Sequence, residues 1–210
     1  MGTHNLRGND IDEENIIYIY HKAKRADSFQ EKMSHKWNYF GINSRGIIHI
    51  IMSIRILVMD VDGTLTDGKL YLGPTGEIMK VFDVKDGYAI SKLLPSEGML
   101  SAIISGRNTP IVDLRAKELN ICEVHQGVSD KLTVLKEIQQ KYGIRNDSIA
   151  YIGDDISDVE CMNYCGLSAC PNDAASCVKD KASYVCRRTA GHGAVREFIE
   201  YISQYNKQQI

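Results

Sequence analysis

The chain has 210 residues, which is enough for one α/β domain of good size with an extension. Its 25 Lys and Arg residues nearly balance its 27 Asp and Glu residues, so the formal net charge is −2. This balance excludes the strongly basic surface that binds nucleic acid or anionic membranes, and we expect neither partner. The sequence also has no uninterrupted apolar run of the ~18 residues that a membrane-spanning helix needs.

The six cysteines lie in apolar or helical sequence without a recognisable secretion signal. We therefore expect reduced, partly buried thiols and a cytoplasmic protein. Three of the cysteines lie close together, but their spacing matches no CxxC pair and no histidine is near, which argues against a zinc site. The cysteines are Cys122, Cys161, Cys165, Cys170, Cys177 and Cys186.

Residues 1–52 differ in character from the rest of the chain. They mix Asn, Asp, Lys, His and scattered aromatic residues without a sustained helix or strand period. Met52-Ser53 resembles a natural start directly before the first predicted strand. We expect 1–52 to be a poorly ordered extension or upstream sequence from a mis-assigned start, followed by one domain over 53–205 and a tail over 206–210.

From residue 54 onward, predicted strands and helices alternate. Residues 69–72 and 77–82 flank Gly73-Pro74-Thr75-Gly76 and predict a β-hairpin. The other predicted strands cover 54–59, 99–104, 121–125, 148–152 and 166–170. The predicted helices cover 86–94, 110–119, 131–142, 156–163 and 194–205. This alternation predicts an α/β fold with a doubly wound parallel sheet.

Capping residues support several of these helix boundaries. Thr109 and Pro110 suit the N-cap and first position of one helix. Ser129 or Asp130 can cap the next helix, and Gly143 can end it. Pro95 is expected to lie just beyond the end of the helix over 86–94.

The first predicted strand ends in two acidic residues. Asp60 and Asp62 alternate with Val61, so both carboxylates leave the strand end in the same direction. Two neighbouring carboxylates repel, and a fold tolerates them mainly when a cation such as Mg²⁺ neutralises the pair. Asp, Gly and Thr are also ordinary residues of solvated turns, so this stretch alone leaves both interpretations open.

Two further strand ends carry polar residues that suit the same site. The strand over 99–104 is followed by Ser105-Gly106-Arg107, and the strand over 148–152 by Gly153-Asp154-Asp155-Ile156-Ser157-Asp158. Lys131 lies between them at a predicted helix start. Each feature alone is common as a cap, a turn or a solvated lysine. Ligands of open α/β sheets bind beyond the carboxyl ends of the strands, so their joint occurrence predicts one site.

Together these segments resemble the motifs of the haloacid dehalogenase-like hydrolases, over about residues 54–205. The resemblance implies a Mg²⁺-dependent phosphatase in which Asp60 is the nucleophile and Asp62 the general acid and base. It implies that the transferring phosphoryl group is bound by Ser105, Gly106 and Lys131. The implied Mg²⁺ ligands are Asp60, Asp62 through its backbone carbonyl, Asp154 and Asp155.

The spacing of the motifs leaves no room for the substrate-selecting cap domain of this superfamily. Only the hairpin and one helix separate Asp62 from Ser105, and only one helix and one strand separate Ser105 from Lys131. The chain more closely resembles a cap-less subgroup, the 3-deoxy-D-manno-octulosonate 8-phosphate phosphatases, also through Val84-Lys85-Asp86-Gly87-Tyr88 and Gly191-His192-Gly193-Ala194-Val195-Arg196-Glu197. The resemblance implies a homotetramer assembled through the hairpin flap.

The same resemblance implies how the sugar is recognised. A sister branch that hydrolyses nine-carbon ulosonic acid 9-phosphates has Glu where this chain has Arg107, and Lys where it has Glu118. An arginine can pair bidentately with the carboxylate of the sugar acid, which favours the octulosonate and leaves the nine-carbon acids as the alternative. The glycine-rich tail is expected to reach a neighbour's active site. The implied substrate-binding residues are Arg107, Arg115, Gly191, Gly193 and Arg196.

Two alternatives in which the protein is not a phosphatase also remain open. A phosphoryl-accepting signalling switch would use a similar acidic cluster, serine and lysine. Such a switch lacks the second acid two residues after the acceptor, so Asp62 argues against it. An inert interaction domain of the same fold is the other, although every motif residue is present.

Overall fold

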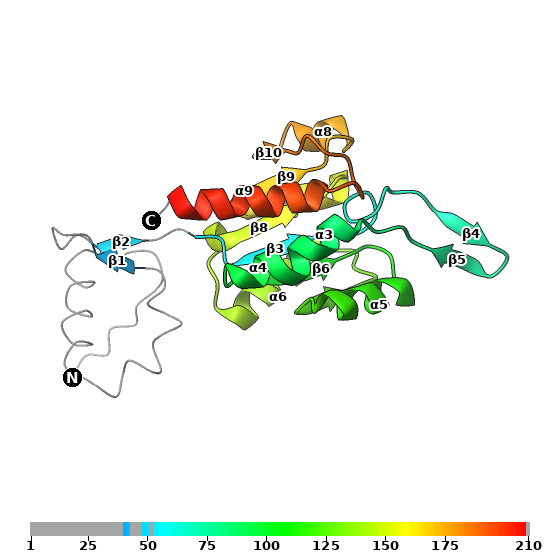
Figure 1. Ribbon diagram of the computed structural model, residues 1–210, viewed down its shortest axis with the longest axis horizontal. Coiled ribbons are helices and arrows are strands. Elements are labelled where there is room, and N and C mark those ends of the chain that lie inside the picture. Colours follow the sequence, from blue (N-terminus) through cyan, green and yellow to red (C-terminus); the bar gives the residue numbers. More distant parts are fainter. Residues whose placement is uncertain (1–39, 43–47, 51–52, 209–210) are drawn as a thin grey trace. The chain divides into compact units, whose positions relative to one another are not determined.

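The computed structural model describes residues 40–42, 48–50 and 53–208 (Figure 1). The chain forms two compact units, Met1–Ile51 and Met52–Ile210. In the first unit, β1 (Phe40–Ile42) pairs antiparallel with β2 (Ile48–Ile50). The prediction that 1–52 are a poorly ordered extension or mis-assigned upstream sequence lies largely outside the described residues and stays a prediction.

The second unit is built on a six-stranded sheet whose strands all run parallel. Their order is β10-β9-β8-β3-β6-β7. The predicted doubly wound parallel sheet is therefore confirmed. The strands are β3 (Ile56–Met59), β6 (Leu100–Ile104), β7 (Glu123–His125), β8 (Ile149–Ile152), β9 (Leu167–Cys170) and β10 (Tyr184–Val185).

Helices cover both faces of this sheet and bury a separate apolar core on each. Alternate residues of β3 point to opposite faces of the sheet. Leu57 and Met59 belong to the core that also contains residues of α5 and α9. Ile56 and Val58 belong to the core that also contains residues of α6 and α7. The helices are α3 (Val84–Tyr88), α4 (Leu94–Ser96), α5 (Pro110–Leu119), α6 (Lys131–Tyr142), α7 (Val159–Tyr164), α8 (Ser176–Lys179) and α9 (Ala194–Gln208).

The predicted caps lie where the sequence indicated. Thr109 accepts a hydrogen bond from the backbone N–H of Ile111, and Pro110 is the first residue of α5. Asp130, rather than Ser129, caps α6.

The helix after the hairpin differs from its prediction. It starts earlier, because Asp83 accepts a hydrogen bond from the backbone N–H of Lys85 and caps α3. It also continues through Pro95, which lies inside α4. A π-helical turn over Ala89–Leu93 separates α3 from α4, and Leu94 N–H bonds to Ala89 C=O across it. The wider turn carries the helix into a residue that has no N–H to donate.

The C-terminal part also extends further than predicted. The final helix runs to Gln208 instead of residue 205. The Asn206 side chain accepts a hydrogen bond from Ile54 N–H at 2.7 Å and donates one to Ile54 C=O at 3.1 Å. This pairing ties the end of α9 to the chain just before β3. The short elements α8 and β10 carry too few residues for a periodic signal and were not predicted.

The predicted hairpin is formed by β4 (Tyr71–Gly73) and β5 (Gly76–Met79), which project from the sheet at its carboxyl end (Figure 1). It exposes large apolar side chains, with Leu72 64% and Ile78 61% accessible. Apart from this hairpin and the following helical segment, residues 53–208 place no element between β3 and β6, so the described unit has no cap domain.

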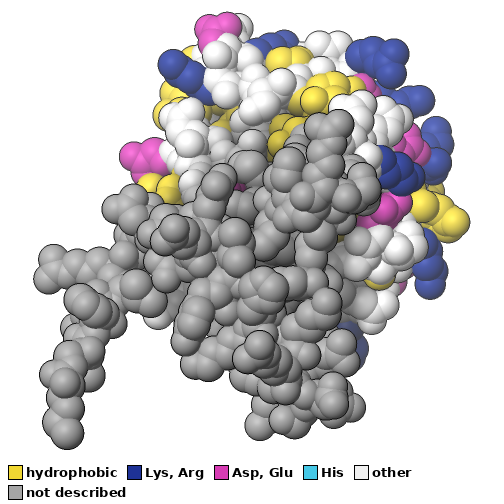
Figure 2. Space-filling view, turned by 90° about the vertical axis from the view of Figure 1, so that its left-hand side faces the viewer, with side chains coloured by type: hydrophobic (Ala, Val, Ile, Leu, Met, Phe, Trp, Pro, Cys, Tyr) yellow, Lys and Arg dark blue, Asp and Glu magenta, His cyan; other side chains and the backbone are white. Residues whose placement is uncertain are grey.

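The described surface carries both signs of charge. On the face drawn in Figure 2, Lys and Arg side chains lie among Asp and Glu side chains, as the nearly neutral composition indicates. Among the helices of the described residues, none is long and apolar enough to cross a membrane.

Candidate active site

The carboxyl ends of three neighbouring strands form the floor of the candidate site. The central strand β3 lies between β6 and β8, with Met59 paired in register to Ile103 and Ile152. These ends deliver Asp60, Ser105 and Asp154 to one cleft of about 190 Å³. The cleft is also lined by Asp62, Gly106, Arg107, Val128, Ser129, Lys131, Asp155 and Ser157.

Lys131 connects the two acidic segments. It is the first residue of α6, and its side chain is only 5% exposed. Its Nζ donates to Asp60 Oδ1 and to Asp158 Oδ1, both at 2.7 Å. Burial by itself lowers the pKa of Lys131, but the two carboxylates outweigh it and raise this pKa. The lysine is therefore a fixed cation beside the predicted nucleophile.

Asp158 is a functional residue that the sequence interpretation left without a role. It is fully buried, and Oδ1 accepts hydrogen bonds from Lys131 and from Tyr151 Oη at 2.7 Å. Oδ2 accepts from the backbone N–H groups of Asp154 and Asp155 at 3.1 and 3.2 Å. Asp158 thus holds both the lysine and the acidic loop in place. In the sequence, its position as the last Asp of the GDDxxD segment was the signal that could have identified it.

Glycine allows this loop to pack so closely. A Cβ on Gly153 would lie 2.3 Å from Asp158 Cγ, and a Cβ on Gly63 would lie 2.0 Å from Asp154 Oδ2. Gly63 also has a φ of 87°, which residues other than glycine rarely adopt. The two glycines therefore bring the loop after β3 and the loop after β8 together.

The acidic groups of the cleft are energetically unfavourable as isolated charges. Burial, followed by repulsion from Asp158, raises the pKa of Asp60 to about 6 despite the neighbouring Lys131. Burial, followed by repulsion from Asp60 and Asp158, raises the pKa of Asp154 to about 7. Carboxylate oxygens of Asp60, Asp154 and Asp158 lie within 4.8 Å of one another.

This cluster fits a hard divalent cation such as Mg²⁺. The oxygens of Asp158 already accept hydrogen bonds from Lys131, Tyr151 and two backbone N–H groups. Asp60 and Asp154 are therefore the side chains best able to bind the ion directly, with Asp158 supporting them. Asp155, predicted as a ligand, lines the cleft but caps the following turn through a hydrogen bond from Ile156 N–H at 2.7 Å.

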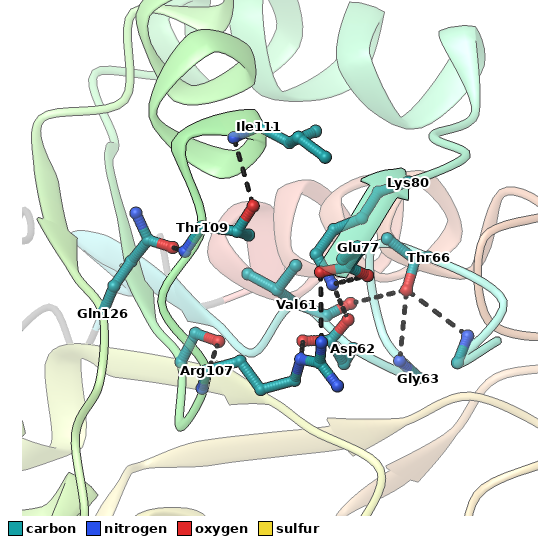
Figure 3. A network of polar contacts seen from close by, with 12 residues as sticks. Val61, Asp62, Gly63, Thr66, Glu77, Lys80, Arg107, Thr109, Ile111 and Gln126 are labelled. Carbon is teal, nitrogen blue, oxygen red and sulfur yellow. Dashed lines mark hydrogen bonds and ion pairs between the residues drawn. The ribbon is translucent and has the colours of Figure 1, made fainter. Parts of the chain in front are cut away.

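The second acid of the first motif lies in a separate ionic network (Figure 3). Asp62 Oδ1 accepts a hydrogen bond from Lys80 Nζ, and Asp62 Oδ2 lies 3.8 Å from Arg107 Nε. Glu77 pairs with both cations, at 3.0 Å from Lys80 and 3.1 Å from Arg107. Thr66 accepts from Gly63 N–H nearby, which helps to fix the turn that carries Asp62.

Comparison with known proteins agrees with this geometry. A family model of haloacid dehalogenase-like hydrolases matches residues 100–199. The 3-deoxy-D-manno-octulosonate 8-phosphate phosphatase of Escherichia coli K12 is 39% identical over 163 residues, which cover 78% of this chain and 86% of that protein. The chain belongs to the haloacid dehalogenase-like hydrolases. The phosphatase of the same description from Yersinia pestis is 40% identical, with 78% and 87% of the two chains covered.

Solved structures of this family have the same fold. A cobalt-bound octulosonate 8-phosphate phosphatase from Haemophilus influenzae aligns with a TM-score of 0.71 and 34% identity, covering 76% of this chain and 92% of that one. The Moraxella catarrhalis phosphatase, solved in complex with magnesium, phosphate and KDO, aligns with a TM-score of 0.71 and 36% identity, covering 76% and 91%.

Four of the residues predicted to bind substrate lie outside the acidic cleft of their own chain. Arg115 pairs with Glu118 at 2.8 Å and lies over the Phe82 ring. Gly191 N–H donates to Thr64 C=O. Gly193 and Arg196 line a second cleft of about 630 Å³, which is lined by Lys85, Arg187, Arg188, Gly193, Arg196, Glu197 and Glu200. Their roles stay predictions.

The predicted phosphate-binding residues do lie in the acidic cleft. Ser105 is buried, and its hydroxyl accepts a hydrogen bond from Arg107 N–H at 3.3 Å. Gly106 follows it and also lines the cleft.

Glu77 and Lys80, which pair with Asp62 and Arg107, are residues that the sequence interpretation missed. Nothing in their spacing distinguished them from the other polar residues of the hairpin.

Proposed function

We propose that this protein is a Mg²⁺-dependent phosphatase that hydrolyses 3-deoxy-D-manno-octulosonate 8-phosphate to the sugar acid and inorganic phosphate. The observation that carries the proposal is the cleft in which Lys131 binds Asp60 while Ser105, Asp62 and Asp154 line its walls. In this proposal the residues at the ends of the strands supply a nucleophile, a proton-transfer group, phosphoryl ligands and a cation site. The similarity to octulosonate 8-phosphate phosphatases supports this assignment of substrate.

The proposed reaction uses Asp60 as a covalent catalyst. Its carboxylate attacks phosphorus and displaces the sugar oxygen, which takes a proton from Asp62. Asp62 then takes a proton from a water molecule that attacks the aspartyl-phosphate, and this releases phosphate and restores Asp60. Mg²⁺ held by Asp60 and Asp154 would neutralise the acidic cluster and polarise the phosphoryl group. Lys131 and the Ser105 hydroxyl bind phosphoryl oxygens and offset their charge.

The surroundings of Asp62 suit a proton-transfer role. One oxygen accepts a hydrogen bond from Lys80, which holds the carboxylate in place. The other oxygen, Oδ2, is buried and has no hydrogen-bond partner among the described residues. An oxygen in this position can give a proton to the departing sugar or receive one from water.

Recognition of the sugar acid is assigned to Arg107. Its side chain lines the cleft and is 43% exposed, with Nη2 directed at Glu77 of the hairpin and Nε directed at Asp62. A guanidinium can bind a carboxylate through two parallel hydrogen bonds, which a neutral sugar cannot reproduce. The tail residues Gly191, Gly193 and Arg196, together with Arg115, are proposed to act on the substrate from a neighbouring subunit.

We also propose that the protein is a homotetramer in the cytoplasm. The exposed apolar side chains of the hairpin are suited to burial between subunits. The cysteines are free thiols, three of them buried, which is the state that a reducing compartment maintains.

A phosphate-release assay tests the proposed function. The panel comprises octulosonate 8-phosphate, nine-carbon ulosonate 9-phosphates and arabinose 5-phosphate, each with Mg²⁺ and with EDTA. We expect the highest kcat/KM for octulosonate 8-phosphate and no turnover with EDTA. A preference for the nine-carbon acids would support the alternative substrate. A preference for arabinose 5-phosphate would contradict the role of Arg107, and an aspartyl-phosphate that lasts minutes would indicate a switch.

A further inference from the structure

Two charged side chains of the hairpin are buried although the hairpin itself is largely exposed. The side chain of Lys80 is 1% exposed and that of Glu77 is 7% exposed, whereas Ile78 between them is 61% exposed. Burying a charge is unfavourable unless it is paired, so this orientation needs a cause. Both charges point toward Asp62 and Arg107 (Figure 3).

The contacts of these residues form a closed ring of alternating charge. Lys80 Nζ bonds to Asp62 Oδ1 and lies 3.0 Å from Glu77 Oε1. Glu77 Oε2 accepts a hydrogen bond from Arg107 Nη2 at 3.1 Å. Arg107 Nε closes the ring at 3.8 Å from Asp62 Oδ2. Two carboxylates and two cations therefore join the hairpin, the first motif and the loop after β6.

We propose that Glu77 is a specificity-determining residue that occupies Arg107 until the carboxylate of the substrate replaces it. The proposal rests on the function proposed above, in which Arg107 binds the sugar carboxylate. In the free protein, Glu77 gives Arg107 the same type of partner that the substrate brings. When an acidic sugar phosphate binds, Arg107 exchanges one carboxylate for another, and its charge stays paired.

Lys80 is the positioning residue that makes this exchange feasible. Removing the partner of a buried carboxylate normally destabilises it strongly. Glu77 keeps its contact with Lys80 when Arg107 leaves, so its charge remains neutralised. The same Nζ binds Oδ1 of Asp62 and so holds this carboxylate in place, while Oδ2 lies 3.8 Å from Arg107 Nε.

Arg107 favours acidic over neutral substrates, and its contact with Glu77 limits this preference. A sugar phosphate without a carboxylate cannot replace Glu77, so it would gain nothing from Arg107. The preference is moderate in size, because Arg107 is 43% exposed and a partly solvated ion pair contributes little. Glu77 also competes with the acidic substrate, and removing it should strengthen binding of that substrate alone.

The test measures KM and kcat of Glu77→Gln with octulosonate 8-phosphate and with arabinose 5-phosphate, which has no carboxylate. The amide keeps the shape of the side chain and loses the charge that pairs with Arg107. We expect KM for the octulosonate to fall about threefold, and the ratio of the two KM values to fall by the same factor. An unchanged ratio, or a rise in KM for the octulosonate, overturns the proposal.

Two further variants separate the mechanism from a general change in charge. In an Arg107→Met background, Glu77→Gln should no longer alter the ratio of the KM values, because the competing contact is already absent. The matched control is Asp147→Asn, which removes a carboxylate 2.7 Å from Arg145 outside the cleft and should leave the ratio unaltered. A shift in the ratio with either variant contradicts the proposal.

Lys80 is tested by comparing Lys80→Met with Lys80→Arg. Lys80→Met removes one of the two cations that Asp62 and Glu77 share, and kcat should fall for both substrates. Lys80→Arg should restore most of kcat, whereas equal loss in both variants overturns the positioning role.

If the native protein does not hydrolyse octulosonate 8-phosphate, the proposed function itself fails. If it does hydrolyse this substrate and Glu77→Gln leaves the ratio unchanged, only the present inference fails.

Discussion

Asp158 connects the groups that the proposed reaction requires. It binds Lys131, Tyr151 and the backbone of the acidic loop through both carboxylate oxygens, and it is fully excluded from solvent. Lys131 in turn binds Asp60. A buried residue therefore helps to determine where Asp60 and the acidic loop lie.

We predict that Asp158→Asn impairs both stability and activity. An amide cannot accept at both positions, so its NH₂ group would face either Lys131 or two backbone N–H groups. We expect the free energy of unfolding to fall by about 3 kcal/mol and kcat to fall about 100-fold. Urea denaturation and phosphate release measure the two effects. Tyr151→Phe, which removes one hydrogen bond only, should have a smaller effect, and equal losses would contradict this account.

Substitutions of the two acids of the first motif should lower turnover to different degrees. Asp60→Asn should abolish turnover, because the covalent intermediate cannot form on an amide. Asp62→Asn should lower kcat by roughly 10³, the contribution of general acid and base catalysis. Steady-state phosphate release measures both, and circular dichroism checks that each variant is folded. Turnover that survives in Asp60→Asn would refute the proposed mechanism.

At the scale of elements, α3 and α9 are joined by a buried side chain. Asp86 of α3 accepts hydrogen bonds from Gly193 N–H at 3.2 Å and Arg196 N–H at 2.7 Å, and so caps the start of α9. Burial raises the pKa of Asp86 to about 6, with a smaller contribution from Asp83, although these N–H groups and Arg188 oppose the rise. The cap is therefore provided by a distant segment instead of by the residue before the helix.

The raised pKa of the buried Asp86 predicts a pH dependence of stability. The pKa of Asp86 is about 6 in the folded protein and about 3.9 in the unfolded chain. Between these values the folded state keeps a proton that the unfolded state has lost. The contribution of Asp86 is thus full below about pH 4 and is lost as pH rises through 6. Its size is on the order of 3 kcal/mol, since each pKa unit corresponds to about 1.4 kcal/mol.

Urea denaturation between pH 4 and 7 tests this dependence. We expect the free energy of unfolding of Asp86→Asn to vary less with pH over this interval than that of the native protein, since the amide does not titrate. Identical pH profiles for the two proteins would contradict the assignment. Asp130→Asn, at the exposed cap of α6, serves as the control and should keep the native profile.

The sequence predicted some helices and strands more accurately than others. Alternating apolar runs and local caps predicted β3, β6, β8, α5 and α6, because these signals lie within a few neighbouring residues. Pro95 misled the prediction, since the helix continues through it after a π turn over Ala89–Leu93. The end of α9 was placed too early because its last turn is held by a tertiary contact between Asn206 and Ile54.

At the scale of the whole molecule, the hairpin exposes apolar surface among the residues that the structure describes. Large apolar side chains are exposed on and beside it, whereas the sheet buries its own on both faces. Exposed apolar surface of this kind is typical of an interface. The residues concerned are Leu70, Leu72, Ile78, Met79 and Val81.

We predict that charges on the hairpin dissociate the assembly. The native protein should be a tetramer by light scattering, and the double variant Leu72→Glu and Ile78→Glu should be smaller, because carboxylates would be buried in the interface. Activity on octulosonate 8-phosphate should fall with the tetramer if a neighbour supplies substrate contacts. Leu114→Glu is the matched control, since Leu114 is 72% exposed on α5. A native monomer would refute the prediction.

The sequence by itself determined the parallel α/β fold, the strand ends that carry Asp60, Ser105 and Asp154, and the family resemblance that the relatives confirm. These features depend on local periodicity and on motifs of neighbouring residues. Only the tertiary structure decided that Asp158 supports the cleft and that Glu77 and Lys80 reach Asp62 and Arg107. Such pairings join side chains from separate segments, and the direction of a side chain depends on packing that no local pattern encodes.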